Sequence, residues 1–93
     1  QMERRVAESV ESMAAQGIRR VILWGNTEIT DLCLKVMHAM EQPVRVIAVV
    51  DSTGQHKLAM HPEQAAHCDA DAVVVCQAEA DGLPEHLPVW KLV

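Results

Sequence analysis

The sequence predicts a small three-layer α/β domain, in which helices cover both faces of a mostly parallel sheet of four to five strands. Runs of β-branched and aliphatic residues alternate along the 93 residues with segments of helical periodicity. The strand runs are apolar throughout, which is typical of parallel strands buried on both faces. Because 49% of the residues are hydrophobic but none is Phe or Tyr, we expect an aliphatic core around two Trp rings.

The first 24 residues predict a helix followed by a buried strand. Apolar side chains recur at three- and four-residue steps from Met2 to Gln16, as in an amphipathic helix. Gly17 stands where a helix commonly ends in a glycine. The continuous apolar run from Val21 to Trp24 then predicts the first strand.

The clearest predicted helix runs from Thr27 to Met40. Asn26 or Thr27 can cap its first turn, and Pro43 cannot continue it. One apolar stripe follows the helical period and consists of Ile29, Leu32, Cys33, Val36, Met37 and Met40.

The second half of the chain predicts shorter elements. Residues 44–51 form a β-branched strand that the turn sequence DSTG ends. Residues 55–60 are compatible with one short strand, and HPEQAAHC predicts a short helix with Pro62 in its first turn. The remaining segments are a strand at 71–76, a loop with room for one helical turn at 80–88, and a strand at 88–93.

The order of these elements predicts the topology. Right-handed crossovers leave little freedom, so we expect a Rossmann-like sheet with the strand at 21–24 in its centre. The chain is expected to form one domain, with a leading helix at 1–17 and an α/β core at 18–93. Both chain ends favour a domain excised from a longer protein, because Gln1 precedes the first Met and the last residues are apolar.

The junction after the first strand is the first candidate for a ligand site, because ligands of open α/β sheets bind beyond the carboxyl ends of the strands. A dinucleotide-binding loop has glycines at its first, third and sixth positions, where this chain has Gly25, Thr27 and Thr30. Gly25 permits the tight turn. Thr27 places a side chain where a pyrophosphate would approach, although its hydroxyl can donate a hydrogen bond. Thr30 would hold the helix further from the strand.

The second candidate is the acidic residue that ends the second strand, where such sheets contact a ribose. The predicted cofactor-binding residues are Gly25, Asn26, Thr27, Asp51, Ser52 and Thr53. The three loop residues would donate amides to a phosphate, Asp51 would accept from a ribose hydroxyl or a base, and the last two would form the rim. An Asp after a strand also commonly begins a turn, and both interpretations stay open.

The segments VILWGNTEITDLCLKVM, VRVIAVVD and HPEQAAHCDADAVVV together resemble a known group of small Rossmann-like domains. These are the nucleotide-sugar-binding N-terminal regions of sugar O-acyltransferases, coenzyme-A-binding proteins, and regulatory domains fused to winged-helix domains in bacterial transcriptional regulators. The resemblance implies a ligand-sensing or dimerising module with a nucleotide ligand of the NAD, coenzyme A or nucleotide-sugar type. It also implies that residues 25–27 and Asp51 lie in the binding crevice.

Other residue clusters predict neither a catalytic nor a metal site. His56, His61, His67 and Cys68 match no standard zinc spacing, so we interpret them as solvated or hydrogen-bonded side chains. The serines lack a nucleophile elbow. Cys76, at the end of a predicted strand, has no assignable base and is interpreted as a core residue.

Charge and cysteine content exclude further classes. A net charge of −5 with scattered basic residues disfavours direct contact with nucleic acid. The apolar runs are too short to span a bilayer, so no membrane contact is expected. Three cysteines without a CxxC spacing favour a reducing, cytoplasmic setting.

The sequence therefore predicts a non-catalytic regulatory or ligand-sensing domain that binds a nucleotide-containing molecule or has lost that ability. One alternative is the substrate- or cofactor-binding part of an acyltransferase or dehydrogenase, and another is a structural dimerisation domain without a ligand. Because the edges of so small a sheet must be covered, we expect a homodimer or contact with an adjacent domain.

Overall fold

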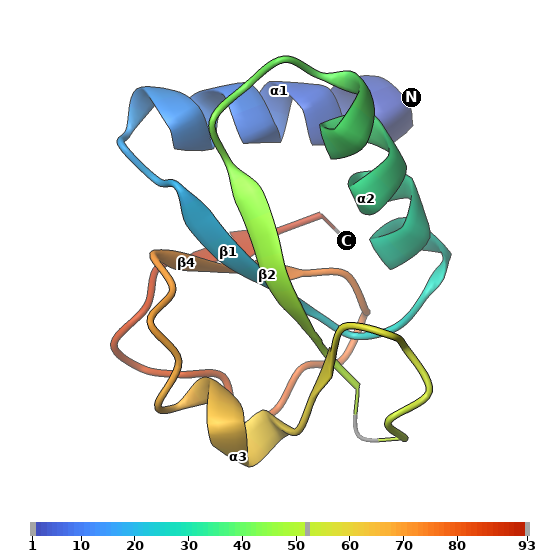
Figure 1. Cartoon of the computed structure of the whole chain (residues 1–93), viewed down its shortest axis with the longest axis vertical. Helices are drawn as coiled ribbons and strands as arrows, with labels where there is room; N and C mark the ends of the chain where they lie inside the picture. The colour runs from blue at the N-terminus through green and yellow to red at the C-terminus, as the bar shows by residue number, and fades with distance from the viewer. Residues whose placement is uncertain (1, 52, 93) are drawn as a thin grey trace.

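The computed structural model describes residues 2–51 and 53–92 and has five strands in one parallel sheet of order β3-β2-β1-β4-β5 (Figure 1). In chain order the elements are α1 (Met2–Ala15), β1 (Arg20–Trp24), α2 (Glu28–Ala39), β2 (Arg45–Val50), β3 (Ala59–Met60), α3 (Pro62–Ala65), β4 (Ala72–Val75) and β5 (Val89–Lys91). The predicted α/β class and the central position of the first strand are confirmed. The order is consistent with a three-layer Rossmann-like fold.

The central strand β1 supplies side chains to both layers of the core. Val21 and Leu23 pack with the residues beneath α1 and α2. Ile22 and Trp24 point to the opposite face, where they pack with residues of β2, β4 and α3. This alternation on a fully buried strand explains why the sequence run is apolar without a break.

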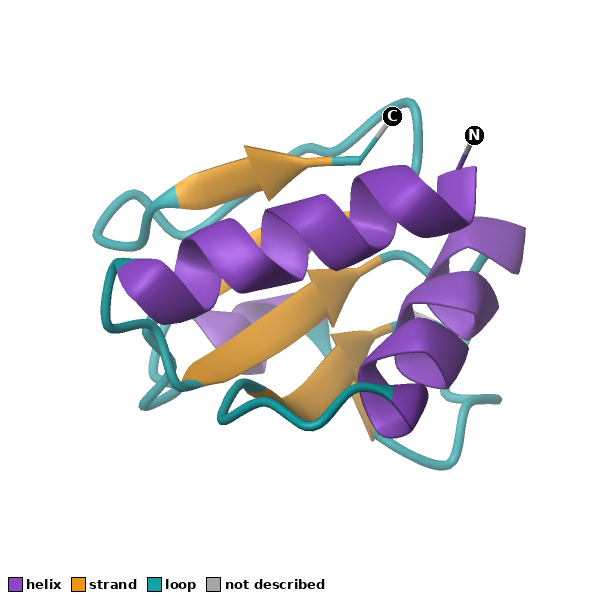
Figure 2. Ribbon diagram, turned by 90° about the horizontal axis from the view of Figure 1, so that it is seen from above, coloured by secondary structure: helices purple, strands orange, loops and turns teal. Residues whose placement is uncertain are grey.

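Helices α1 and α2 lie side by side over one face of the sheet (Figure 2). Helix α1 buries Val6, Val10 and Met13 as predicted, and Gly17, with a φ of +86°, follows its end. Among the described residues no helix is both long and apolar enough to cross a membrane.

The opposite face is covered more thinly, by the four-residue helix α3 and by loops (Figure 1). The predicted short helix is confirmed, and Pro62 is its first residue. Residues 80–88 form a loop with one hydrogen-bonded turn, in which the Leu87 amide donates to the Pro84 carbonyl at 3.4 Å. Leu83 and Leu87 of this loop, together with Ala80, pack against the buried cluster on this side, so the loop takes the place of a second helix on this face.

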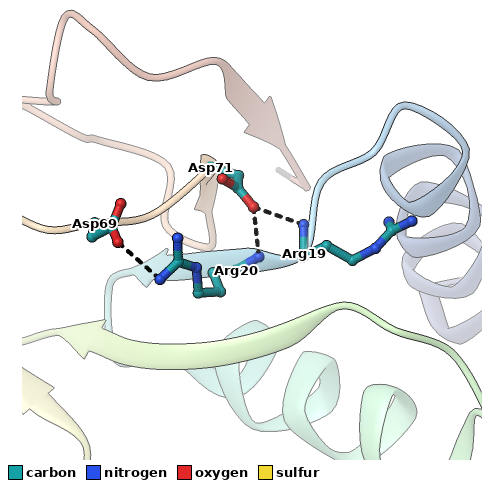
Figure 3. Close-up of polar contacts among 4 residues, drawn as sticks. All are labelled: Arg19, Arg20, Asp69 and Asp71. Atoms are coloured by element: carbon teal, nitrogen blue, oxygen red, sulfur yellow. Dashed lines mark hydrogen bonds and ion pairs between the residues drawn. The ribbon is translucent and has the colours of Figure 1, made fainter.

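The amino ends of β1 and β4 are fastened by an acidic residue (Figure 3). The Asp71 Oδ2 atom accepts hydrogen bonds from the backbone amides of Arg19, at 2.9 Å, and Arg20, at 3.0 Å. These two amides, that of Arg19 first, hold the pKa of Asp71 below its usual value. An exposed ion pair joins Arg20 to Asp69 at 2.9 Å. The contacts fix the alignment of the two strands whose carboxyl ends frame the candidate site.

Strand β2 has one extra residue within the stretch that pairs with β1. Val21 lies level with Val46, but the next residue, Ile22, lies level with Ala48, so Ile47 is an extra residue at a bulge. Beyond the bulge the ladder is regular up to Val50, whose carbonyl oxygen accepts from the Gly25 amide at 3.0 Å. The residue after Val50 is thereby held beside the turn that follows β1.

Candidate functional site

A polar pocket of about 480 Å³ opens at the carboxyl edge of the sheet, where β1, β2 and β4 end. Four of the six predicted site residues line it, and the complete lining is Trp24, Gly25, Asn26, Val50, Asp51, Thr53, Pro62, Gln77, Glu79 and Asp81. Thr27 lines a neighbouring hollow instead, and Ser52 lies outside the described residues. The structure therefore brings the two predicted halves of the site, the loop after β1 and the loop after β2, to one cavity.

Gly25 makes the tight turn that the sequence predicts. Its φ of +109° lies in the left-handed region that favours glycine. A Cβ atom on this residue would lie 2.5 Å from Oε1 of Gln77, a distance that a real Cβ does not tolerate. Gly25 is thus required by its backbone conformation, whereas the flexible Gln77 side chain would have to move away from a Cβ at this position.

Hydroxyl groups of the chain itself bind the first amides of α2. Thr27 is the N-cap: its Oγ1 accepts from the Ile29 amide at 3.2 Å and donates to the Cys76 carbonyl at 2.6 Å. The buried Thr30 hydroxyl accepts from the Thr27 amide at 3.1 Å and donates to the Gly25 carbonyl. Because the Gly25 amide bonds to β2, the amides of Gly25, Thr27 and Ile29 are already paired within the chain.

Asp51 is the centre of the other half of the pocket. Its Oδ1 accepts from the Thr53 amide at 3.0 Å and from the Thr53 hydroxyl at 2.7 Å. Its Oδ2 accepts from the Asn26 side-chain amide and from the His56 backbone amide, both at 3.1 Å. These bonds, the Thr53 hydroxyl first, lower the pKa of Asp51 to about 2.

The Asp51 carboxylate therefore uses all four of its acceptor positions within the chain. It is only 8% exposed. The turn interpretation of this residue is observed directly, and a ribose hydroxyl would have to replace one of the present donors. Its role in binding a nucleoside stays a prediction.

Three polar lining residues were not predicted from the sequence, namely Gln77, Glu79 and Asp81. They follow β4, whose carboxyl end lies next to that of β1. The signal that could have found Gln77 is its place directly after the predicted strand 71–76. Two of the three are acidic, and no Lys or Arg lines the pocket in the described part of the chain, so the pocket is electrostatically negative.

Two of the histidines and two of the cysteines have local structural roles. The His56 Nδ1 accepts from the Leu58 amide, and the His61 side chain caps α3. Within residues 2–51 and 53–92 no three His, Cys, Asp or Glu side chains are arranged to hold a metal ion. Cys33 and Cys76 are buried core thiols, and burial raises their pKa values to about 12 and about 11.

The fold and the pocket together define a small α/β domain with a ligand-sized polar crevice at the carboxyl edge of a parallel sheet. Comparisons with protein-family models, curated proteins and solved structures find no match to this chain. The functional argument therefore rests on the geometry and charge of the pocket.

Proposed function

We propose that this chain is a non-catalytic ligand-sensing domain that binds the nucleoside part of a small molecule in the carboxyl-edge pocket. The observation that carries the proposal is the pocket itself. Its volume of about 480 Å³ is within the range of small-molecule sites. It lies where the chain order reverses between β1 and β4, the usual ligand position in open parallel sheets.

The charge of the lining favours a hydroxyl-bearing ligand over a polyphosphate. A diphosphate would meet the carboxylates of Asp51, Glu79 and Asp81 without a cationic side chain among the described lining residues. It would also compete with the threonine hydroxyls for the first amides of α2. The hydroxyls of a ribose, by contrast, can donate hydrogen bonds to exposed carboxylates such as those of Glu79 and Asp81.

A regulatory role in a larger assembly completes the proposal. The domains that this sequence resembles include regulatory modules of bacterial transcriptional regulators, and we propose that ligand binding here controls an attached domain. We also propose that a homodimer or an adjacent domain covers the sheet edges, although the edge strands, β3 with two residues and β5 with three, are short. The three free cysteines favour the reducing environment of the cytoplasm.

One set of contacts favours a second candidate, a structural domain without a ligand. The amides of Gly25, Thr27 and Ile29 and the carboxylate of Asp51 are all paired within the chain. A domain that has lost its ligand is expected to satisfy such groups internally, because an unpaired buried polar group is destabilising.

Thermal unfolding with added ligands separates the two candidates. We expect adenosine or uridine at millimolar concentration to raise the melting temperature more than ADP, NAD, coenzyme A or a UDP-sugar. A ligand at about a hundred times its Kd stabilises by about 2.7 kcal/mol, which is a shift of several degrees for a domain of this size.

The double variant Glu79→Gln/Asp81→Asn tests the role of charge. Removal of two carboxylates should raise the affinity for ADP relative to adenosine, because the phosphate repulsion falls. Glu85→Gln is the matched control, since Glu85 is an exposed acid of the same loop that does not line the pocket. If no compound shifts the melting temperature of any variant, the structural domain is the correct function.

A further inference from the structure

The Gln77 side chain lies directly on Gly25. The position of a Cβ on Gly25 would be 2.5 Å from the Gln77 Oε1 atom and 2.9 Å from its Cδ and Cγ atoms. Three atoms of this side chain thus occupy the space above the one glycine of the loop. In dinucleotide-binding sheets the pyrophosphate lies over the turn between the first strand and its helix, at the N-terminus of that helix. Here the chain fills that space with its own carboxamide.

The backbone next to Gln77 is firmly held, whereas its side chain is not. The carbonyl of the preceding residue, Cys76, accepts from the Thr27 hydroxyl at 2.6 Å, which ties the end of β4 to the start of α2. The side-chain amide of Gln77 donates one exposed hydrogen bond, to the Glu79 carbonyl. An exposed hydrogen bond of this kind contributes little net free energy, so the side chain can rotate away without disturbing its anchor.

Gln77 also stands on the boundary between two cavities. It lines the polar pocket of about 480 Å³ and a neighbouring hollow of about 360 Å³. The hollow is bordered by Thr27, Glu28 and Ile29 at the start of α2, where the helix dipole favours an anion and the Glu28 carboxylate opposes one. Rotation of the Gln77 side chain would therefore join the nucleoside pocket to the space in which an attached phosphate would lie.

We infer that Gln77, in addition to the carboxylates of the lining, controls whether the pocket accepts phosphate-bearing ligands. In its present position the carboxamide takes the place of the phosphate next to Gly25, so a nucleoside fits beside it and a nucleotide has to displace it. This inference rests on the proposed function, because it assigns a specificity to the same pocket.

Calorimetric titration of the wild-type chain and of Gln77→Ala with adenosine and with ADP tests the inference. We expect the variant to bind ADP about two- to tenfold more tightly than wild type, because ADP no longer has to break one exposed hydrogen bond and displace the side chain. Because Gln77 and Gly25 both line the pocket, adenosine affinity should change less than ADP affinity, so the ratio of the two affinities shifts towards ADP in the variant.

Two further variants control for indirect effects. Gln77→Glu keeps the length of the side chain and adds a negative charge, so it should bind ADP more weakly than wild type. Gln55→Ala removes an exposed glutamine that does not line the pocket and should change neither affinity. Circular dichroism and the melting temperature verify that each variant is folded, and Gln77→Asn, which shortens the side chain by one methylene, replaces Gln77→Ala if that variant fails this check.

The outcomes separate this inference from the proposed function. If adenosine binds and ADP affinity is equal in wild type and Gln77→Ala, the role of Gln77 is wrong and the proposed function stands. If only the variant binds ADP and wild type binds neither compound, the role of Gln77 is correct and the proposed function is wrong. If no protein binds either compound, both are wrong.

Discussion

Asp51 combines two roles that the sequence alone could not separate. As the residue after a parallel strand it lies at the place of ligand contact, and its four hydrogen bonds organise the loop that follows β2. The bonds come from Asn26 in the loop after β1 and from Thr53 and His56 in the loop after β2. The carboxylate therefore joins the two loops whatever else it binds.

The lowered pKa of Asp51 makes the stability of the domain dependent on pH. The unfolded chain has an Asp pKa of about 3.9, whereas the folded value is about 2. The stabilisation is therefore fully present above about pH 4 and is lost as the pH falls towards 2. We expect Asp51→Asn to lower the free energy of unfolding at pH 7 and to reduce its decrease between pH 4 and pH 2.

Urea unfolding at several pH values measures this effect. The acid dependence should be reduced but not abolished in Asp51→Asn, because Asp71 also has a lowered pKa. Glu85→Gln, an exposed acid outside the pocket, is the control. An unchanged profile in Asp51→Asn would contradict the hydrogen-bonded state of the carboxylate.

At the scale of elements, the sequence predicted helices and strands well wherever the spacing of the apolar residues agreed with the residues that begin and end an element. Helix α2 has an apolar stripe, a capping threonine and a proline beyond its end, and its observed bounds differ by one residue at each end from the predicted range Thr27–Met40. Strand β3 has only two residues, which are too few for a periodic pattern. The sequence therefore indicated only that residues 55–60 are compatible with a short strand. The residue Gln77 was missed because it belongs to a loop whose position is set by the sheet rather than by a local motif.

Thr30 has the position that the last glycine has in a dinucleotide-binding loop. The prediction was that this side chain would hold α2 away from β1. The structure places it fully buried, with its hydroxyl between the Gly25 carbonyl and the Thr27 amide. The hydroxyl therefore connects the helix to the turn, which no pattern of apolar residues would reveal.

We expect Thr30→Val to destabilise the domain by about 1–3 kcal/mol, because it leaves the Gly25 carbonyl and the Thr27 amide without their partner in a nearly isosteric site. Thr30→Ser, which keeps the hydroxyl, should retain most of the stability. Chemical denaturation of the three proteins measures the difference. Equal losses in both variants would indicate that the methyl group, rather than the hydrogen bonds, carries the effect.

At the scale of the whole molecule, the two faces of the sheet differ in how completely they are covered. The face beneath α1 and α2 includes Cys33 and Cys76, both fully enclosed, while Cys68 on the thinner face is partly exposed. The three thiols therefore report on different parts of the same fold.

We expect a thiol reagent such as DTNB to modify one cysteine, Cys68, in the native protein and the other two only when the protein unfolds. Burial raises the pKa values of Cys33 and Cys76, which reduces their thiolate content as well as their access. Cys68→Ser should remove the native reaction, as followed by absorbance and mass spectrometry. Rapid modification of Cys33 or Cys76 under native conditions would contradict this packing.

The alternation of strands and helices was enough to predict the sheet and its central strand, and therefore where its carboxyl edge lies. It was not enough to predict the ligand, because the chemistry of that edge depends on loops. The acidic residues Glu79 and Asp81 reach the pocket from a segment with no recognisable motif. The same segment covers the second face of the sheet, so its sequence serves two purposes at once.

Because of the bulge at Ile47, strand β2 can lose one residue without a change in the face to which its other side chains point. In a regular strand, loss of one residue inverts every side chain beyond it. Here Val46 and Val49 pack on the same face although they are three positions apart, and Ile47 and Ala48 both belong to the other. A chain that lacked Ile47 would regain strict alternation without inverting either half. During evolution the distance between the amino end of this strand and its pocket could therefore change by one residue, while Asp51 stayed beside Gly25.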